Sequence, residues 1–334
     1  MDPVLQTVPL GAGPWPTVDP FLFCVHHLDA YPAGDGCFGP AASLAGRDLG
    51  SDFSGRDGWS MYHGRTVPGF PQHPHRGFET ITVVRRGLID HADSLGAAAR
   101  YGDGDVQWMT AGSGIVHAEM FPLLDTAGPN TGDFFQLWMN LPSADKMADP
   151  YFSMFWDGTM PVAADAGAAL TVVAGSFGDR RAPAPPPASW AARPDSDVAI
   201  WHLTLAPGAE CDLPPATHDA TVRVLYVVAG GVRLGSTPVP VSTAAVVEPR
   251  RPVTVAAGAA AAEVLVLQGR PIGEPVAQYG PFVMNDRAGI EQAFRDYQRT
   301  GFGGWPWPAD DPIHGSAPDR FARRADGRLE TPTD

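Results

Sequence analysis

The chain has 334 residues, of which 44% are hydrophobic and 18% charged, and its formal net charge is −14. This is the composition of a globular protein large enough for one or two domains. An acidic chain whose arginine pairs are isolated from one another repels phosphate backbones and anionic lipid surfaces, so direct nucleic-acid binding is disfavoured. No stretch reaches the roughly 18 apolar residues of a membrane span, and the first residues do not resemble a signal peptide.

The three cysteines are scattered and show no CxxC spacing. A sparse, odd set of this kind is typical of reduced thiols rather than of a disulfide framework. We therefore expect a cytoplasmic protein, with the nucleus as the alternative if the source is eukaryotic.

The 38 glycines and 35 prolines favour many short strands joined by turns over long helices. Residues 1–18 hold four prolines and predict an extended lead-in, and residues 19–27 predict a first buried strand. Residues 31–65 are rich in Gly, Asp and Ser and have weak periodicity, so we expect a long loop there, placed as a lid over the site.

The segment from residue 69 to residue 119 carries two pairs of side chains that can bind a metal. His73 and His75 stand at i and i+2, and so do His117 and Glu119. Alternate residues of an extended strand point to the same face, so each pair presents two donors together. The residues between the pairs read as strands and tight turns, which a barrel or jelly roll folds back on themselves. The spacing predicts a mononuclear metal site in an all-β barrel.

A shell of three imidazoles and one carboxylate suits iron, manganese, nickel, cobalt or copper. Structural zinc is a poor fit because the site lacks thiolates. Glu119 is also placed to act as a catalytic base, because a carboxylate beside the metal can accept a substrate proton.

The second half of the chain repeats the strand pattern without the ligands. The run at residues 83–88 has a counterpart at residues 227–232. Superposing the two runs brings non-ligand or unpaired residues to the four ligand positions: Thr217, Asp219, Ala261 and Glu263. The sequence thus predicts a second barrel of the same architecture without a metal.

The end of the chain predicts one short helix. Asn285 is the expected N-cap, and Gly301 is expected to end the helix. The predicted domains are an N-terminal metal-binding barrel at 1–179 with the insertion at 31–65, a Pro-rich linker at 180–196, a metal-free C-terminal barrel at 197–284, and a helix and tail at 285–334.

Several longer motifs resemble the pirin family of bicupins. They are HPHRGFET at 73–80, GDVQWMTAG at 104–112, HAEM at 117–120, FQLWMNLP at 135–142, QYGPFVMN at 278–285 and FGGWP at 302–306. The resemblance implies two cupin (jelly-roll) barrels with a single metal, usually iron, in the N-terminal one. It places the family's ligands on the same four residues, His73, His75, His117 and Glu119. The insertion before Tyr62, the Pro-rich linker and the tail beyond Pro308 depart from the common pattern.

The resemblance implies two functions of different classes. Family members are described as quercetin 2,3-dioxygenases, which would act on a flavonol bound through its 3-hydroxyl together with O₂. They are also described as metal-dependent transcriptional coregulators, which would bind a protein partner through the redox state of the iron. A third possibility is a cupin enzyme that acts on some other small molecule. The sequence does not rank the substrates, because the cavity walls come partly from the 31–65 loop.

Other side chains near the ligands have both functional and structural readings. His91 is expected either to orient a ligand or to be a hydrogen-bonded structural histidine. Glu79 is expected to be a structural strand residue rather than a ligand. Four residues are expected to line a cavity or to support the ligands, although half of any such strand must face the core: Gln107, Trp108, Met109 and Gln136.

Overall fold

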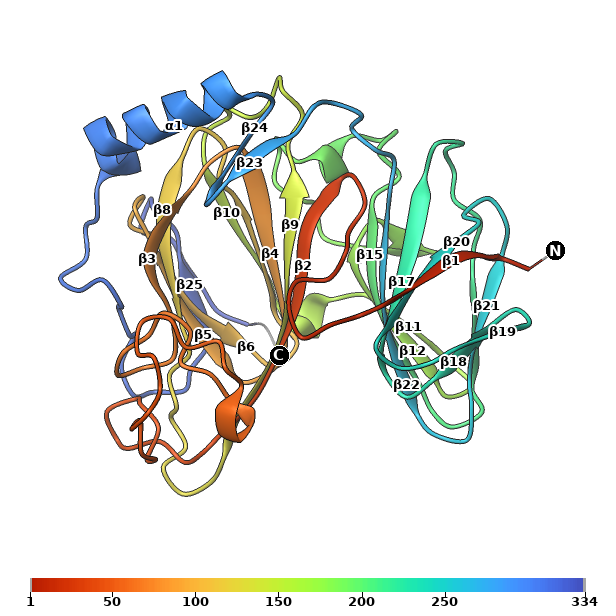
Figure 1. Cartoon of the computed structure of the whole chain (residues 1–334), viewed down its shortest axis with the longest axis horizontal. Helices are drawn as coiled ribbons and strands as arrows, with labels where there is room; N and C mark the ends of the chain where they lie inside the picture. Colours follow the sequence, from red (N-terminus) through yellow and green to blue (C-terminus); the bar gives the residue numbers. More distant parts are fainter. Residues whose placement is uncertain (1, 333–334) are drawn as a thin grey trace. The chain divides into compact units, whose positions relative to one another are not determined.

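The structure is a computed structural model that describes residues 2–332. The chain forms two compact units. The first barrel unit comprises Val25–Gly158 and Glu274–Asp334, and the second barrel unit comprises Met1–Cys24 and Thr159–Gly273 (Figure 1). Strands dominate both units, and the expected all-β class with a short C-terminal helix is confirmed.

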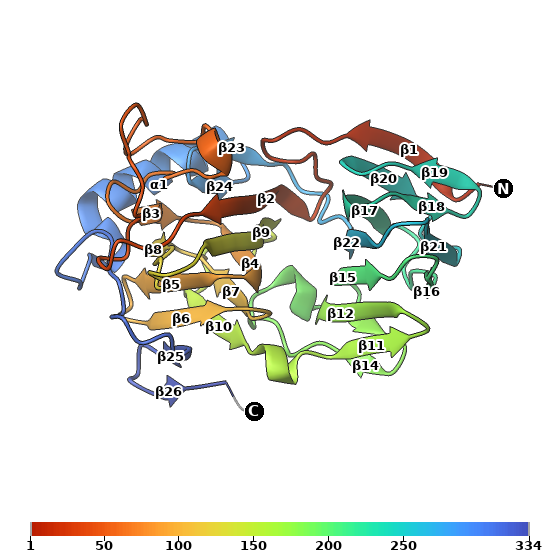
Figure 2. The same cartoon turned by 90° about the horizontal axis from the view of Figure 1, so that it is seen from below.

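The first barrel unit consists of two facing sheets (Figure 2). One sheet has the order β10-β7-β4-β9-β2, and the other has the order β26-β25-β6-β5-β8-β3. The strands are β2 (Phe21–Tyr31), β3 (Gly69–His75), β4 (Phe78–Arg86), β5 (Leu88–Asp93), β6 (Ala98–Gly102), β7 (Val106–Thr110), β8 (Ile115–Met120), β9 (Asn130–Asn140), β10 (Tyr151–Phe155), β25 (Phe321–Arg323) and β26 (Leu329–Glu330).

The second barrel unit pairs a seven-stranded sheet, β1-β20-β17-β22-β15-β12-β11, with a four-stranded sheet, β16-β21-β18-β19. Its strands are β1 (Val4–Pro9), β11 (Val162–Asp165), β12 (Ala168–Ala174), β15 (Ala199–Leu205), β16 (Glu210–Leu213), β17 (Val222–Ala229), β18 (Val232–Leu234), β19 (Thr237–Val239), β20 (Thr243–Val247), β21 (Val253–Ala257) and β22 (Ala262–Gly269). Alternate residues of these strands form an aliphatic core that includes Leu203, Leu225 and Val264.

The division into units differs from the predicted boundaries at 179 and 284. The lead-in supplies β1, which pairs with β20, and β12 pairs with β15 beyond the predicted linker. Residues 180–196 therefore do not connect two units, since both their ends lie in the second one. Within this segment β14 (Arg180–Arg181) pairs with β13 (Ser176–Phe177), and the indole Nε1 of buried Trp190 donates to the carbonyl of Arg270 at 2.9 Å.

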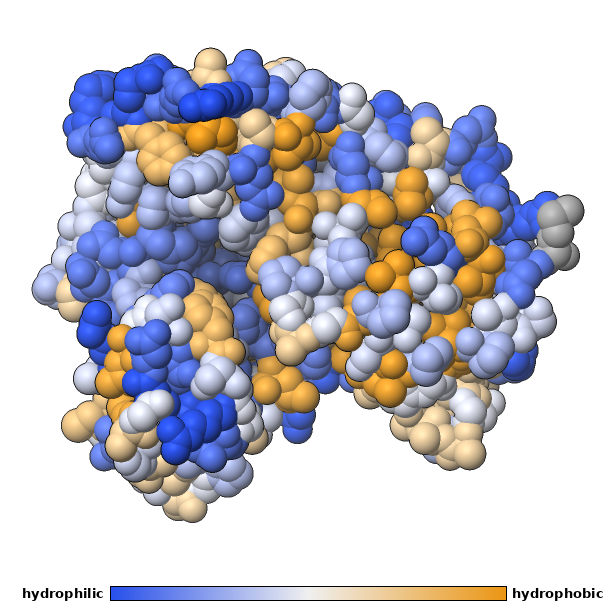
Figure 3. Space-filling model, viewed as in Figure 1, coloured by the Kyte–Doolittle hydropathy of each residue, from blue (hydrophilic) through white to orange (hydrophobic). Residues whose placement is uncertain are grey.

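The helix α1 (Arg287–Thr300) follows the hairpin of β23 (Ala277–Tyr279) and β24 (Phe282–Met284). Its N-cap is Asp286, one residue after the predicted Asn285, because the Asp286 carboxylate accepts from the backbone N–H of Gly289 at 2.8 Å. Gly301 ends the helix with φ of 56°, as predicted. Figure 3 shows hydrophilic side chains on its outer face and a hydrophobic band beneath it.

Short 3-10 turns complete the described chain: η1 (Arg56–Gly58), η2 (Asp157–Thr159), η3 (Trp190–Ala192) and η4 (Gly301–Gly303). Among residues 2–332 no helix has the length and apolar character needed to cross a bilayer.

A buried ion pair ties the C-terminal tail to the first barrel. The Arg100 guanidinium donates twice to the Asp90 carboxylate at 2.7 Å, and both side chains are fully buried. The same guanidinium donates to the carbonyls of Gly315 and Ala317, just before β25 extends the sheet. The tail beyond Pro308 is therefore part of the barrel wall.

Replacing Arg100 with methionine should destabilise the protein. The Arg100→Met change leaves the Asp90 carboxylate buried without its counter-charge, which costs about 3–5 kcal/mol in the free energy of unfolding. Urea unfolding would measure this loss. The matched control is Arg287→Met, because the Arg287 side chain is 92% exposed and its removal should change stability by less than about 0.5 kcal/mol. Equal losses in the two variants would contradict the assignment.

Candidate metal centre

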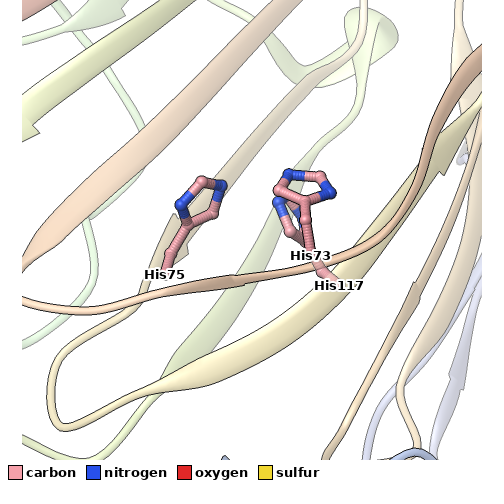
Figure 4. Close-up of side chains that lie close together, drawn as sticks. All are labelled: His73, His75 and His117. Carbon is pink, nitrogen blue, oxygen red and sulfur yellow. The ribbon is translucent and has the colours of Figure 1, made fainter. Parts of the chain in front are cut away.

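Three histidines converge at one end of the first barrel. Strands β3 and β8 are antiparallel neighbours, and their register sets His73 directly opposite His117, with His75 two residues further along β3. One ring nitrogen from each of the three lies within 4.8 Å of the others. The ring centroids are 4.4 to 4.9 Å apart, and Figure 4 shows the imidazoles gathered in one cluster. The structure thus brings together the three histidines predicted from spacing.

The environment keeps these imidazoles neutral. Burial lowers the pKa of His75 and of His117 well below the ordinary value, and it lowers the pKa of His73 to about 4. The Nδ1–H of His73 is placed to donate to the Pro71 carbonyl at 2.9 Å, which would leave its Nε2 lone pair available. Both ring nitrogens of His117 are buried and have no hydrogen-bond partner. A neutral, unpartnered nitrogen donor is what a bound cation requires.

Glu119 lies beside the cluster, with Oε2 4.0 Å from Nε2 of His117. Three side chains hold its carboxylate: Gln136 donates to Oε2 at 2.7 Å, while the hydroxyls of Thr82 and Tyr101 donate to Oε1 at 3.2 and 3.4 Å. Burial raises the pKa of Glu119, and these hydrogen bonds oppose that rise. Glu119 as the fourth ligand remains a prediction.

The donor chemistry of this site fits a transition metal. Imidazole nitrogens with one nearby carboxylate suit iron, manganese, cobalt, nickel or copper better than calcium or magnesium, which prefer oxygen. The three histidines and Glu119 would hold the ion, and fewer than six protein ligands leave positions for substrate.

Aromatic rings surround the histidines, and their position beside the site was not predicted from the sequence. The ring of His75 contacts Phe78 and Trp138 at centroid distances of 5.0 and 5.4 Å. Phe70 lies 6.2 Å from His73. The sequence does contain a signal that Trp138 lies near the site. Trp138 stands two residues after Gln136 and therefore shares its face of β9.

The other predicted site residues fall on two faces. His91 is cross-strand from Glu119, and its ring centroid is 5.6 Å from that of His117. Its Nδ1 accepts from the Nε2 of Gln107 at 2.8 Å. Met109 shares the face of Gln107, whereas Trp108 points to the opposite face of β7 and contacts Phe155. The expectation that Trp108 lines the cavity is therefore wrong, because strand alternation turns it away.

Two further expectations concern Glu79 and the insertion. Glu79 is fully buried and accepts from the hydroxyl of Thr110 at 2.7 Å, as a structural strand residue does. In the insertion, the ring of Tyr62 stacks on Phe70 at 5.1 Å, and its hydroxyl donates to Asp29 at 2.6 Å. The insertion is thus anchored against the ring that neighbours His73, and its role as a lid remains a prediction.

A pocket of about 490 Å³ in the first barrel unit does not coincide with the histidines. Its lining includes Tyr31, Leu88, Phe121 and Phe134 but none of the predicted site residues. The metal centre is therefore assigned from donor geometry rather than from the volume of a cavity.

The interior of the second barrel is aliphatic. On β16 and β21, Leu213 pairs with Val253, and both are buried in the aliphatic core. Glu263 is hydrogen-bonded to Nε2 of His202 at 2.5 Å, and both side chains lie on the outer face of the seven-stranded sheet. Within the described part of the chain, the histidine triple of the first barrel is the one group of three or more potential ligands found.

Comparison with known proteins matches a family model to each half of the chain. The profile of the Pirin family matches residues 46–139, and that of the Pirin C-terminal cupin domain matches residues 200–303. The chain is 38% identical over 237 residues to a Pseudomonas aeruginosa protein, with 70% of this chain and 79% of the relative covered. It is 39% identical to a pirin-like protein of Solanum lycopersicum, with 70% and 77% covered.

The chain belongs to the pirin family. Two cupin barrels in one chain, as expected, are therefore confirmed. The name of the Pseudomonas relative provisionally assigns it quercetin 2,3-dioxygenase activity. The crystal structure of a quercetin 2,3-dioxygenase from Acinetobacter baumannii matches this pirin with a TM-score of 0.71 and 27% identity, covering 91% of this chain and 99% of the other.

Removal of one histidine should abolish metal binding. Purified protein loaded with Ni(II) should hold one ion per chain, and metal at 100 times its dissociation constant should stabilise the fold by about 2.7 kcal/mol. His117→Ala should lose both effects, because His117 supplies one of the three clustered imidazole nitrogens. His218→Ala, which changes a histidine of the second barrel unit, is the control. Metal analysis and thermal unfolding measure the two effects, and full nickel occupancy in His117→Ala would contradict the site.

Proposed function

We propose that this pirin is a metal-dependent dioxygenase that opens the heterocyclic ring of quercetin-type flavonols with O₂, using Fe(II). The observation that carries the proposal is the cluster of three neutral histidines with a buried carboxylate beside it, inside a barrel. The names of the Pseudomonas relative and of the Acinetobacter structure support the same substrate class.

Bound iron would supply Lewis acidity and one-electron chemistry to the flavonol and to dioxygen. The protein supplies the rest. Glu119 accepts the proton of the substrate's 3-hydroxyl, and Gln136 holds the carboxylate in place for this transfer through its 2.7 Å hydrogen bond. Phe78 and Trp138 give His75 an apolar surround that suits a flat aromatic substrate and limits the access of water.

Turnover tests the proposal directly. Fe(II)-loaded protein mixed with quercetin in air should consume one O₂ for each flavonol lost, as measured with an oxygen electrode and by the decay of the flavonol absorbance. Absence of turnover with iron, manganese, nickel, cobalt and copper alike would rule the activity out.

Glu119 should matter to the rate more than to folding. Glu119→Gln removes the proton acceptor while keeping the shape, so kcat should fall by about 10²- to 10⁴-fold. Glu291→Gln on the exposed side of α1 is the matched control and should leave kcat unchanged. Metal content measured in parallel separates a lost base from a lost ion, and an unchanged kcat in Glu119→Gln would remove Glu119 from the mechanism.

A further inference from the structure

A chain of hydrogen bonds fixes the side-chain amide of Gln107 inside the first barrel. One carboxylate oxygen of Asp93 accepts from the backbone N–H groups of Leu95 and Ala97, and the other lies 3.2 Å from Nε2 of His91. On the far side of the imidazole, Nδ1 of His91 lies 2.8 Å from the side-chain nitrogen of Gln107. Asp93, His91 and Gln107 are all fully buried.

The chemistry of these contacts orients each member. The side-chain NH₂ of Gln107 can only donate, so Nδ1 of His91, which it faces, is the acceptor. Nε2 of His91 is then the N–H that donates to the carboxylate of Asp93. The amide cannot turn over without losing this bond. Its carbonyl oxygen Oε1 is consequently held on the other side, where it has no hydrogen-bond partner among residues 2–332.

The oxygen belongs to the polar interior beside the metal centre. Gln107 pairs across the sheet with Thr82, whose hydroxyl contacts Glu119. Thr80, two residues from Thr82 on the same face of β4, also has a buried hydroxyl without a partner. A buried acceptor without a partner destabilises the fold, so its presence here favours a ligand that satisfies it.

We propose that Oε1 of Gln107 accepts a hydrogen bond from a hydroxyl of the substrate other than the one that gives its proton to Glu119. Gln107 is thereby a specificity-determining residue, and His91 and Asp93 position it. This inference rests on the proposed function. It assigns to the site a preference for polyhydroxylated aromatic substrates over those that carry a single hydroxyl.

Binding of two flavonols tests the assignment. Quercetin carries several hydroxyls, whereas 3-hydroxyflavone keeps only the 3-hydroxyl. Dissociation constants of both for the Ni(II)-loaded protein, measured by fluorescence titration under argon, give a discrimination ratio for each variant. Wild-type protein should favour quercetin, and Gln107→Met should reduce the ratio about three- to tenfold by weakening quercetin alone.

The controls separate this inference from the proposed function on which it rests. Gln278→Met, at an exposed glutamine of β23, should leave the ratio unchanged. Thermal unfolding and nickel content check that each variant folds, and Gln107→Asn, which withdraws the acceptor by one methylene, replaces the methionine variant if that one does not. Equal weakening of both flavonols, or an unchanged ratio, would overturn the role of Gln107 alone. Binding of neither flavonol by wild-type protein would remove the proposed function together with it.

Discussion

The metal centre depends on the register between β3 and β8. Because side chains alternate along a strand, a slip of one residue would turn His117 out of the barrel and bring Val116 in. The observed register places His73 opposite His117, and the pairing of β8 with β5 on its other side sets Asp93 opposite the same histidine. Gly69 permits the close approach at the start of β3, since it has φ of +134° and a Cβ there would lie 2.5 Å from the carbonyl of Glu119.

The far end of β3 is held just as firmly. The ammonium group of buried Lys146 donates to the carbonyl of Gly77, to the side-chain oxygen of Asn140 and to the carbonyl of Val283, at 2.8, 2.7 and 3.2 Å. Burial lowers its pKa to about 8. One cation thus fastens the turn after His75 to two other strands, β9 and β24. Strand β3, which carries His73 and His75, is thus fixed at both ends, and this preorganises its two imidazoles.

The sequence predicted the parts of this protein that depend on local pattern. Strand alternation and two i, i+2 pairs were enough to bring His73, His75 and His117 together, and a glycine was enough to end the helix. The compact units depend instead on pairings between distant segments. The unit boundaries follow from β1 joining β20 and from β12 joining β15, and no local composition marks either pairing. The proline-rich stretch looked like a connector for the same reason, because the burial of Trp190 depends on Arg270, 80 residues away.

The two barrels differ in the polarity of their interiors, and this difference bears on the role of the polar groups buried in the first barrel. A closed barrel is most easily stabilised by aliphatic side chains, and the second barrel uses them at the positions of Leu213 and Val253. The first barrel instead buries Glu119, His91 and Gln107, although each needs partners to offset the loss of water. Most of these polar groups find hydrogen-bond partners within the network. Among residues 2–332, however, the two ring nitrogens of His117 and Oε1 of Gln107 have none. Folding alone would favour replacing such atoms with methyl groups, so their position beside the three histidines favours a cation and a polar ligand as their partners.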